Sequence, residues 1–477
     1  MRRKVWVAVA ALALVAGACG SSKKSTTGAG TTAGAGTTAG AATTAKPADT
    51  TAAPTGGATT AKPAGTTVAP TGAATADSTA GTKCGLGDGK KATGNPIKIG
   101  AVSTMIPGID FKDGPNSQTA YFNCVNDNGG VHGRPIQLIN LNDELDAGKA
   151  GAAASKLIDS EKVVAMAGGF SIIDCPVNSK LYAEKKFNVI VAGVPAECFG
   201  LPNVAATNMG PHYSAQGAAQ AVIADGAKGK IVHVTGNAPG SDYNGSSIKT
   251  LAQAAGLQFE DVQIPTPITD ANTLVLDVVK KAGKGGGVVI TFTPPEGLAI
   301  MKAAEDQGVI DDVVWGSATP LNDASVAKAL SAKWNGKMRI NAELALLDSK
   351  GTDMTLYRDV IGKYAKDTPL GSFGQMGFLI GRVVVDTLNK MDAKDIDDPL
   401  KVNAAIGKVV NFKTDILCKP WYFGENAKYH VPNNWDRTVV PKDGKMEQKD
   451  DCFEIKAVDD VLTYVRDLES KQNLNKG

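Results

Sequence analysis

Short apolar runs alternate with longer amphipathic segments from about residue 96 onward. The first apolar runs are Ile97–Val102, Val163–Ala167 and Asn188–Ala192, and a segment with helical spacing, Asp174–Lys185, separates the last two. Short runs rich in Val and Ile indicate buried strands, whereas the longer amphipathic segments indicate helices. Strands that alternate with helices are typical of parallel sheets covered by helices.

A second series of the same kind begins after Pro211. Gly256 and Gly308 each follow a predicted helix in this series, where a residue with positive φ readily ends a helix. The apolar runs are 230–234, 257–264, 287–292 and 313–315, and the helical segments are 246–255, 271–282 and 295–307. The sequence therefore predicts two doubly wound, Rossmann-like α/β lobes.

The pattern after residue 338 predicts that the chain returns to the first lobe. A strand-like run at 338–347 precedes helical segments at 353–366, 373–391 and 399–408. The pattern assigns the later residues to neither lobe. We therefore expect the first lobe at 95–211 and 338–425, the second lobe at 212–337, and a C-terminal extension at 426–477.

The N-terminus carries the pattern of an export signal. Arg2-Arg3-Lys4 precedes an apolar run at 5–16, which is too short to span a bilayer comfortably. Ala16-Gly17-Ala18-Cys19 resembles a lipobox, the site where bacterial lipoproteins are diacylated and cleaved, although Ala replaces the usual Leu at its first position. We expect residues 1–18 to be a lipoprotein signal peptide and Cys19 to carry the lipid. The alternative is an ordinary secretion signal with an incidental cysteine.

Composition predicts a tether and disfavours a nucleic-acid partner. Residues 19–94 are dominated by Thr, Ala, Gly and Pro, and such a segment cannot bury enough apolar surface to offset the entropy of ordering. We expect it to connect the lipid to the folded part. The chain has 50 Lys and Arg against 48 Asp and Glu, which gives a net charge of +2 without a basic stripe. Nucleic acid is therefore not an expected partner.

Motifs of catalysis and of cofactor binding are missing from the sequence. It contains no G-x-S-x-G, no H-E-x-x-H and no ATP-binding G-x-x-x-x-G-K-[ST]. Its 4 histidines are scattered and it has no C-x-x-C, so neither a zinc site nor a catalytic triad is indicated. The glycines at 85, 87 and 89 lack the preceding strand of a dinucleotide site. We therefore expect a protein that is not an enzyme and that has no cofactor and no metal.

The segment 121–164 carries a family resemblance. A predicted helix ends in Asn126-Asp127-Asn128-Gly129-Gly130, Gly133 precedes the next strand, an acidic loop follows, and a second helix ends in Lys156-Leu157-Ile158. This order is similar to the opening of the type 1 periplasmic binding proteins, the family that includes the Leu/Ile/Val-binding protein of amino-acid importers. The resemblance covers about 96–424. It implies two lobes joined by a hinge, which close on a solute held in the cleft between them.

Cysteine usage fits an exported protein. The chain has 7 cysteines, and six remain if Cys19 carries lipid, which allows many connectivities. We favour pairs of near neighbours, which are Cys84–Cys124 and Cys418–Cys452 by proximity and elimination. The third pair, Cys175–Cys198, is implied by the resemblance, because relatives have a similar disulfide near the cleft.

Open α/β sheets bind ligands beyond the carboxyl ends of their strands. This rule selects the loops that follow the predicted strands, and the resemblance selects the same loops. The resemblance also implies that one aromatic side chain from the helical segment 373–391 contacts the solute. The expected ligand-binding residues are Phe170, Ser171, Ile172, Gly193, Val194, Tyr243, Thr293, Ala318 and Phe373.

This chain departs from the amino-acid receptors where those receptors hold a charged solute. The resemblance implies a Ser and a Thr for the solute carboxylate, and Ser171 matches the Ser, but the Thr position falls near Pro195. It implies a Glu for the ammonium group, and Ala318 or Thr319 stands there. An unpaired buried charge costs several kcal/mol. We therefore expect a solute that is less polar, or differently charged, than a standard aliphatic α-amino acid.

These features predict a monomeric, extracytoplasmic solute-binding lipoprotein of an ABC importer, held at the outer face of the cell membrane through Cys19. Its solute is amino-acid-like or a related small organic molecule. Because the chain has no ATP-binding motif, permease and ATPase subunits are its expected partners. The alternative is a sensor lipoprotein that signals to a membrane partner through the same closure. A structural wall protein is disfavoured, because the two-lobe pattern predicts a cleft.

Overall fold

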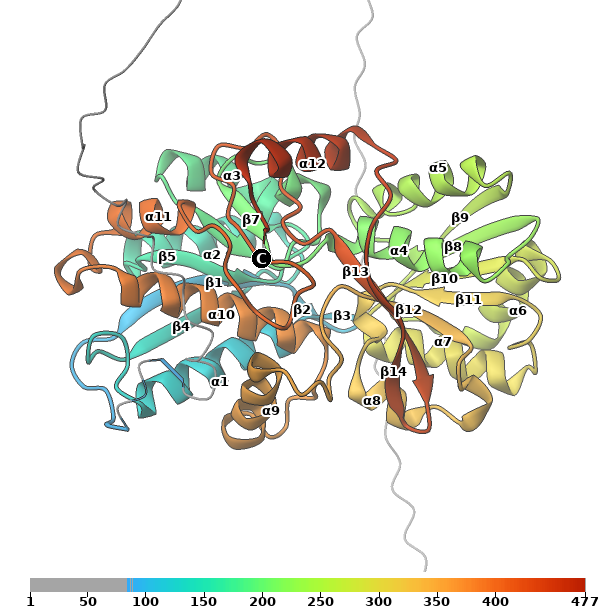
Figure 1. Cartoon of the computed structure of the whole chain (residues 1–477), viewed down its shortest axis with the longest axis horizontal. Coiled ribbons are helices and arrows are strands. Elements are labelled where there is room, and N and C mark those ends of the chain that lie inside the picture. The colour runs from blue at the N-terminus through green and yellow to red at the C-terminus, as the bar shows by residue number, and fades with distance from the viewer. Residues whose placement is uncertain (1–83, 86, 88, 477) are drawn as a thin grey trace, which may run out of the picture. The chain divides into compact units, whose positions relative to one another are not determined.

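The computed structural model describes residues 84, 85, 87 and 89–476 (Figure 1). The predicted signal peptide, Cys19 and most of the predicted tether lie outside the described residues. The described part contains two large, mainly parallel sheets with helices on their faces. The predicted fold class, α/β with two doubly wound lobes, is confirmed.

The first lobe is built on a sheet of 5 parallel strands in the order β4-β1-β5-β6-β7. Helices cover both faces of such a sheet, so its strands β5, β6 and β7 are fully buried. The strands are β1 (Ile97–Ser103), β4 (Ile136–Asn142), β5 (Ala165–Gly169), β6 (Val189–Val191) and β7 (Val204–Ala206). The helices between them are α1 (Asp113–Asp127), α2 (Ala147–Ser155) with a π-helical turn at Lys156–Ser160, and α3 (Asp174–Glu184). A short hairpin of β2 (Met105–Ile106) and β3 (Ile109–Asp110) follows β1.

The second lobe is built on a sheet of 7 strands in the order β14-β13-β12-β11-β10-β8-β9. Its parallel part consists of β8 (Lys230–Gly236), β9 (Gln258–Ile264), β10 (Gly287–Thr291), β11 (Val314–Ser317) and β12 (Met338–Ala342). The helices are α4 (Gly210–Ala224), α5 (Ser246–Ala254), α6 (Ala271–Ala282), α7 (Pro294–Asp306) and α8 (Ala324–Ala329).

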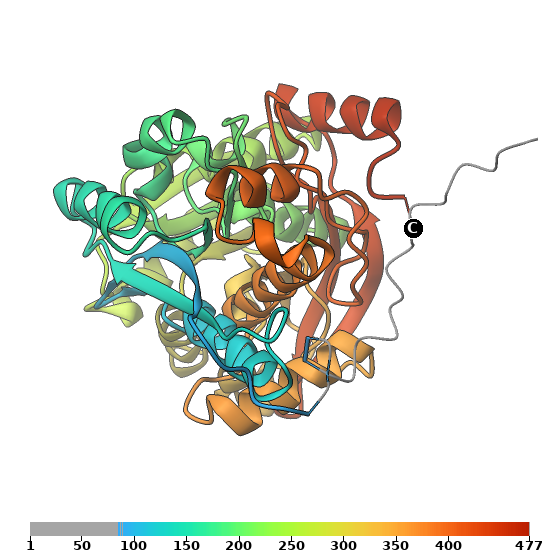
Figure 2. The same cartoon turned by 90° about the vertical axis from the view of Figure 1, so that its left-hand side faces the viewer.

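Strand β12 moves the boundary between the lobes. The sequence pattern placed the return to the first lobe at residue 338, but β12 pairs with β11 in the second sheet. A buried strand has the same apolar pattern in either sheet, so the run 338–347 did not reveal which strand it pairs with. The chain enters the first lobe after Ala342 and forms α9 (Thr352–Tyr364), α10 (Ser372–Lys390) and α11 (Pro399–Gly407). Figure 2 shows α10 and α11, in orange, beside the blue and cyan elements of that lobe.

The C-terminal extension contributes to both lobes. β13 (Trp435–Lys442) and β14 (Lys445–Glu454) continue the second sheet as an antiparallel hairpin beside β12. α12 (Asp460–Gln472) then buries Leu462 and Val465 in the core cluster of the first lobe that contains Tyr182 and Phe199. Figure 1 shows this path in red. Residues 426–477, which the sequence pattern assigned to neither lobe, therefore join the two.

Aspartate side chains fix the starts of several helices. Asp146, Asp270 and Asp459 each accept a hydrogen bond from a backbone N–H in the first turn of α2, α6 and α12. These caps satisfy donors that have no partner inside the helix. Helices α4 and α7 have a proline within their first two residues instead, where its missing N–H costs nothing.

Three disulfides connect the elements. The pairs are Cys84–Cys124, Cys175–Cys198 and Cys418–Cys452. They are the pairs that the sequence favoured. Cys418–Cys452 joins the segment after α11 to β14. A covalent link therefore adds to the noncovalent contacts between the part of the chain that returns to the first lobe after Ala342 and the C-terminal extension.

Helices α1 and α10 touch at two glycines. Gly377 on α10 is buried, and a Cβ atom placed on it would lie 2.0 Å from the carbonyl oxygen of Gly114 on α1. No side chain can be accommodated there unless the two helices separate, because protein interiors are close-packed. This contact holds the return segment against the first sheet.

We expect Gly377→Ala to lower the free energy of unfolding by about 1–3 kcal/mol or more, because it forces two packed backbones apart. Gly362 on α9 is a matched control, since it is exposed and a Cβ atom there meets nothing within 4 Å. Gly362→Ala should raise the free energy of unfolding by about 1 kcal/mol through helix propensity alone. Urea denaturation of both variants measures the two effects. A stable Gly377→Ala protein would show that α1 and α10 do not touch at this point.

Candidate functional site

A cavity of about 150 Å³ lies where the carboxyl-terminal loops of the two sheets face each other. The first lobe contributes Gly108, Ile109, Phe111, Ile172, Gly193, Val194, Pro195, Phe373 and Met376. The second lobe contributes Thr235, Gly236, Ala238, Pro239, Gly240, Ser241, Asn244, Thr266, Thr291, Phe292, Thr293, Thr319 and Pro320. Residues where the chain passes between the lobes complete the wall, namely Asn208, Gly210, Pro211, Ser214 and Glu343.

The β2–β3 hairpin brings the two lobes into contact at one side of the cavity. A Cβ atom on Gly108 would lie 3.1 Å from the nitrogen of Pro267 in the second lobe. Gly108 has a φ of 84°, which glycine adopts without steric cost. The tip of the hairpin can therefore approach the second lobe closely.

Most of the cavity wall is apolar. Phe111 and Phe373 meet edge to face with their ring centroids 5.2 Å apart, and Phe292 lies on the wall of the second lobe. The polar side chains are mainly hydroxyls, from Ser214, Thr235, Ser241, Thr266, Thr291, Thr293 and Thr319. A concave, apolar wall with a few polar groups is the usual form of a small-molecule site.

Five of the residues that the sequence nominated line this cavity. They are Ile172, Gly193, Val194, Thr293 and Phe373. All of them belong to loops after parallel strands or, for Phe373, to the first turn of α10. Their contact with a solute stays a prediction.

The other nominated residues, Phe170, Ser171, Ala318 and Tyr243, do not form the wall. Phe170 packs behind Phe373, with the ring centroids 6.5 Å apart. Ser171 Oγ accepts hydrogen bonds from the backbone N–H groups at the start of α3, so it acts as a helix cap. Ala318 is buried and its backbone N–H donates to a carbonyl group of β10.

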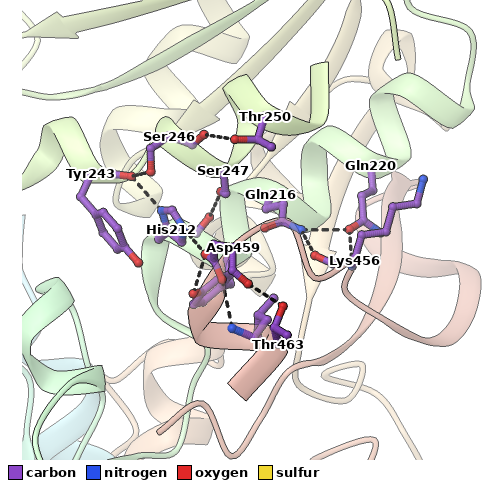
Figure 3. A network of polar contacts seen from close by, with 12 residues as sticks. His212, Gln216, Gln220, Tyr243, Ser246, Ser247, Thr250, Lys456, Asp459 and Thr463 are labelled. Atoms are coloured by element: carbon purple, nitrogen blue, oxygen red, sulfur yellow. Dashed lines mark hydrogen bonds and ion pairs between the residues drawn. The ribbon is translucent and has the colours of Figure 1, made fainter. Parts of the chain in front are cut away.

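Tyr243 stacks on His212 instead of facing the cavity. The two rings lie 3.9 Å apart at an interplanar angle of 8°. His212 Nδ1 lies 2.7 Å from the carbonyl oxygen of Tyr243, and its Nε2 lies 3.3 Å from Asp459 Oδ2. The Tyr213 hydroxyl donates to the same carboxylate oxygen at 2.8 Å. Figure 3 shows Tyr243, His212 and Asp459 in this network, which fixes the Tyr243 ring from the C-terminal extension.

Glu343 follows β12 directly and carries the one ionisable side chain among the described residues that line the cavity. It is 1% exposed. Its Oε2 accepts a hydrogen bond from the backbone N–H of Met209. Burial raises the pKa of the Glu343 carboxyl to about 8, although hydrogen bonds from Met209 and Thr319 oppose the shift. Removal from water penalises the charged form, and no Lys or Arg among the described residues forms an ion pair with it.

A second buried carboxyl group, Asp436 on β13, lies near Glu343. Burial raises the pKa of Asp436 well above its ordinary value, and the charge of Glu343 adds to the shift. Within the described structure, Asp436 Oδ2 and Asn341 Oδ1 have no hydrogen-bond partner. A Cβ atom on Gly217 would lie 2.2 Å from the first and 1.9 Å from the second. Two acceptors so placed favour a proton on Asp436, because only the protonated acid can donate a hydrogen bond.

The sequence pattern did not single out Glu343. It falls in the strand-like run 338–347, between Ala342 and Leu344, which are both fully buried. One carboxylate inside an apolar run is a usable signal, since unpaired glutamates are rarely buried. That signal shows burial, but it does not show which cavity the side chain meets.

The described fold and its cavity agree with a family of receptors. The periplasmic binding protein family model matches residues 96–444. The chain belongs to this family, and its fold is the type 1 fold of the Leu/Ile/Val-binding-protein-like structures. It is therefore a solute-binding protein and not an enzyme. No curated protein matches the chain.

Solved structures share the fold at low sequence identity. A fatty acid ABC transporter substrate-binding protein from Thermomonospora curvata is 19% identical, with a TM-score of 0.63 over 78% of this chain and 95% of that chain. A branched-chain amino acid ABC transporter protein from Thermus thermophilus with bound valine is 14% identical, with a TM-score of 0.66 over 76% and 97%. A solute-binding protein from R. palustris in complex with benzoate is 16% identical, with a TM-score of 0.61 over 77% and 99%. Identities this low establish the fold and leave the solute open.

Family membership places the protein outside the cytoplasm. Among the helices that the structure describes, none has the length and apolar character needed to cross a bilayer.

We expect the free energy of unfolding to fall between pH 5 and pH 8. Glu343 has an ordinary pKa of 4.5, raised by burial to about 8, so in this window the folded state binds more protons than the unfolded state. One such group lowers stability by about 1.4 kcal/mol per pH unit. Burial also raises the pKa values of Asp113 and Asp174 to about 6, which acts in the same direction.

Glu343→Gln removes this titration, so the variant should lose less stability than the wild type over the same window. Urea denaturation at a series of pH values measures the two slopes. Equal slopes would mean that the Glu343 carboxyl group is already ionised in the folded protein at pH 5.

Proposed function

We propose that the protein is the lipid-anchored solute-binding component of an ABC importer. The observation that carries the proposal is the cavity, because its wall comes from both lobes. A solute bound there contacts both lobes and favours the closed arrangement over the open one. The closed lobes would then form a joint surface for a permease, and the importer's ATPase subunits would supply the energy, since this chain has no ATP-binding motif.

The solute in this proposal is a small organic molecule with a compact apolar body. A cavity of about 150 Å³ lined by Leu, Ile and Phe is known to hold benzene, and this cavity has a similar volume and several aromatic side chains. The hydroxyl groups of the second-lobe wall would bind the few polar atoms of the solute. An aliphatic α-amino acid fits less well, because Ser171, which matches the carboxylate-binding Ser of the amino-acid receptors, does not line the wall, and Pro195 stands near the position of their Thr.

The membrane anchor in this proposal is the diacylated Cys19. Two acyl chains hold a protein at a bilayer firmly, whereas one gives marginal binding. Residues 20–83 would then give the receptor its reach from the membrane. The receptor acts as a monomer.

A solute should be identified by a thermal-shift screen, and Phe373→Ala should then weaken its binding. The protein is first unfolded and refolded to remove carried solute, and is then screened against amino acids, amides, amines, aromatic acids and nucleobases. A solute at 100 times its Kd adds about 2.7 kcal/mol of stability. Truncating a central aromatic contact costs about 1–2 kcal/mol or more of binding free energy, so Phe373→Ala should weaken the affinity about tenfold or more by titration calorimetry.

Phe453 is a matched control for this variant, because it is half-buried like Phe373 but lies on β14, outside the cavity wall. Phe453→Ala should leave the affinity unchanged. Equal losses in both variants would point to a general loss of structure and would count against the cavity as the binding site. If no compound in the panel showed saturable binding, that result would count against the receptor function itself.

We expect Cys19→Ala to release the protein from membranes, because the cysteine sulfur is the attachment point of the lipid. Fractionation of cells that express the wild type or the variant, followed by immunoblotting of membrane and soluble fractions, measures this. Metabolic labelling with a fatty acid should mark the wild type alone. If the Cys19→Ala protein stayed with the membranes, the proposed anchor would be wrong.

A further inference from the structure

The charge of the cavity wall is the starting point. Among the described residues that line it there is no Lys, Arg or His, and Glu343 is the single acid. The net charge of the wall is therefore zero when Glu343 is protonated and negative when it is ionised. An anionic solute meets no compensating positive charge in either state, and burying an uncompensated charge is costly.

The surroundings of Glu343 favour its protonated form. The side chain is 1% exposed, and it contacts the backbone N–H of Met209 and the hydroxyl group of Thr319. Asp436 on β13 is a second buried acid near it, and the charge of Glu343 raises the pKa of Asp436, so the two acids disfavour being ionised together. Arg437 follows Asp436, but the charges that act on it are those of Asp436, Asp451 and Asp415.

The hydroxyl group of Thr319 is also engaged elsewhere. It accepts a hydrogen bond from Asn341 Nδ2 at 3.1 Å and lies 2.8 Å from Ser214 Oγ. The Ser214 hydroxyl in turn accepts the backbone N–H of Thr319 at 2.7 Å. These polar groups therefore hold one another, whereas a protonated Glu343 has an O–H group that can be donated to a bound molecule.

Building on the proposed receptor function, we infer that Glu343 determines the specificity of the cavity by donating a hydrogen bond to the solute. The solute is a small uncharged molecule whose carbonyl or amide oxygen accepts this hydrogen bond. Its apolar body lies against Phe111, Phe292 and Phe373. The cavity thereby rejects carboxylates of the same shape. An uncharged solute would differ from the ligands of two similar solved structures, because valine and benzoate each carry a carboxylate.

Two matched series test the inference. Benzamide, benzoate and benzylamine share one ring, and butyramide, butyrate and butylamine share one short chain, so that each series varies the charge of the head group alone. Binding to the full protein at pH 7 is measured by titration calorimetry. We expect the amide in at least one series to bind ten times or more tighter than the matching acid and amine.

Variants of Glu343 separate hydrogen-bond donation from charge. Glu343→Gln keeps a donor but cannot ionise, and Glu343→Leu removes the donor at similar volume. Glu343→Gln should bind the amide at least ten times tighter than Glu343→Leu does. Circular dichroism confirms that each variant is folded, and if Glu343→Leu does not fold, the comparison of Glu343→Gln with the wild type across pH replaces it.

The pH dependence gives an independent readout. Because burial places the pKa of Glu343 at about 8, ionisation between pH 7 and pH 9 removes the donated hydrogen, and wild-type affinity for the amide should fall about tenfold. Glu343→Gln should show no such fall. An equal fall in both proteins would mean that Glu343 does not contact the solute.

Two other outcomes would overturn the inference. Tighter binding of the amine, lost in Glu343→Gln, would make Glu343 an ionised partner for a cation. Tighter binding of the acid would show that the wall tolerates an anion. If neither series binds but another solute from the wider panel does, the receptor function stands. The inference is then tested by the charge of that solute and by whether its affinity changes in the Glu343 variants. The receptor function fails with the inference only when no solute binds at all.

Discussion

Parallel strands can be joined only by connections that return over a face of the sheet, so the carboxyl ends of all the strands meet at one edge. In this protein each lobe has such an edge, and the two edges face each other. The loops after β5, β6, β8, β10 and β11 therefore meet in one place, although their residues are far apart in the sequence. The cavity is a consequence of strand direction first and of particular side chains second.

This dependence explains how much of the fold could be predicted from the sequence. Buried parallel strands form apolar runs, so most strands of both lobes were predictable, and so was the edge at which a ligand would bind. The 3-residue strand β7 was not predicted, because so short a run shows no periodicity. β14 was not predictable in the same way, because nearly all of its residues are exposed or half-buried and it shows no alternation. β12 was predictable as a strand but not as a member of the second sheet, because its apolar run carries no information about its neighbours.

The candidate site shows the same division. Gly193, Val194 and Thr293 follow directly from the rule about strand ends, and they line the cavity. Tyr243 lies in a loop that borders the cavity, but its ring turns to His212, which Asp459 of the C-terminal extension holds in place. The direction of a loop side chain thus depends on a partner more than 200 residues later in the chain, as the separation of 247 between His212 and Asp459 shows. No local pattern contains that information.

The C-terminal extension also shapes the chemistry of the cavity. β13 pairs with β12 and places Asp436 near Glu343, and α4 approaches the same point through Gly217, which has no side chain to separate the groups. Water is thereby excluded from behind Glu343, while no cationic side chain among the described residues pairs with it. A carboxyl group in such a place favours its neutral form. The strand that the extension adds to the second sheet therefore helps to turn an acidic residue into a hydrogen-bond donor, and this change of role sets which solutes the cavity can hold.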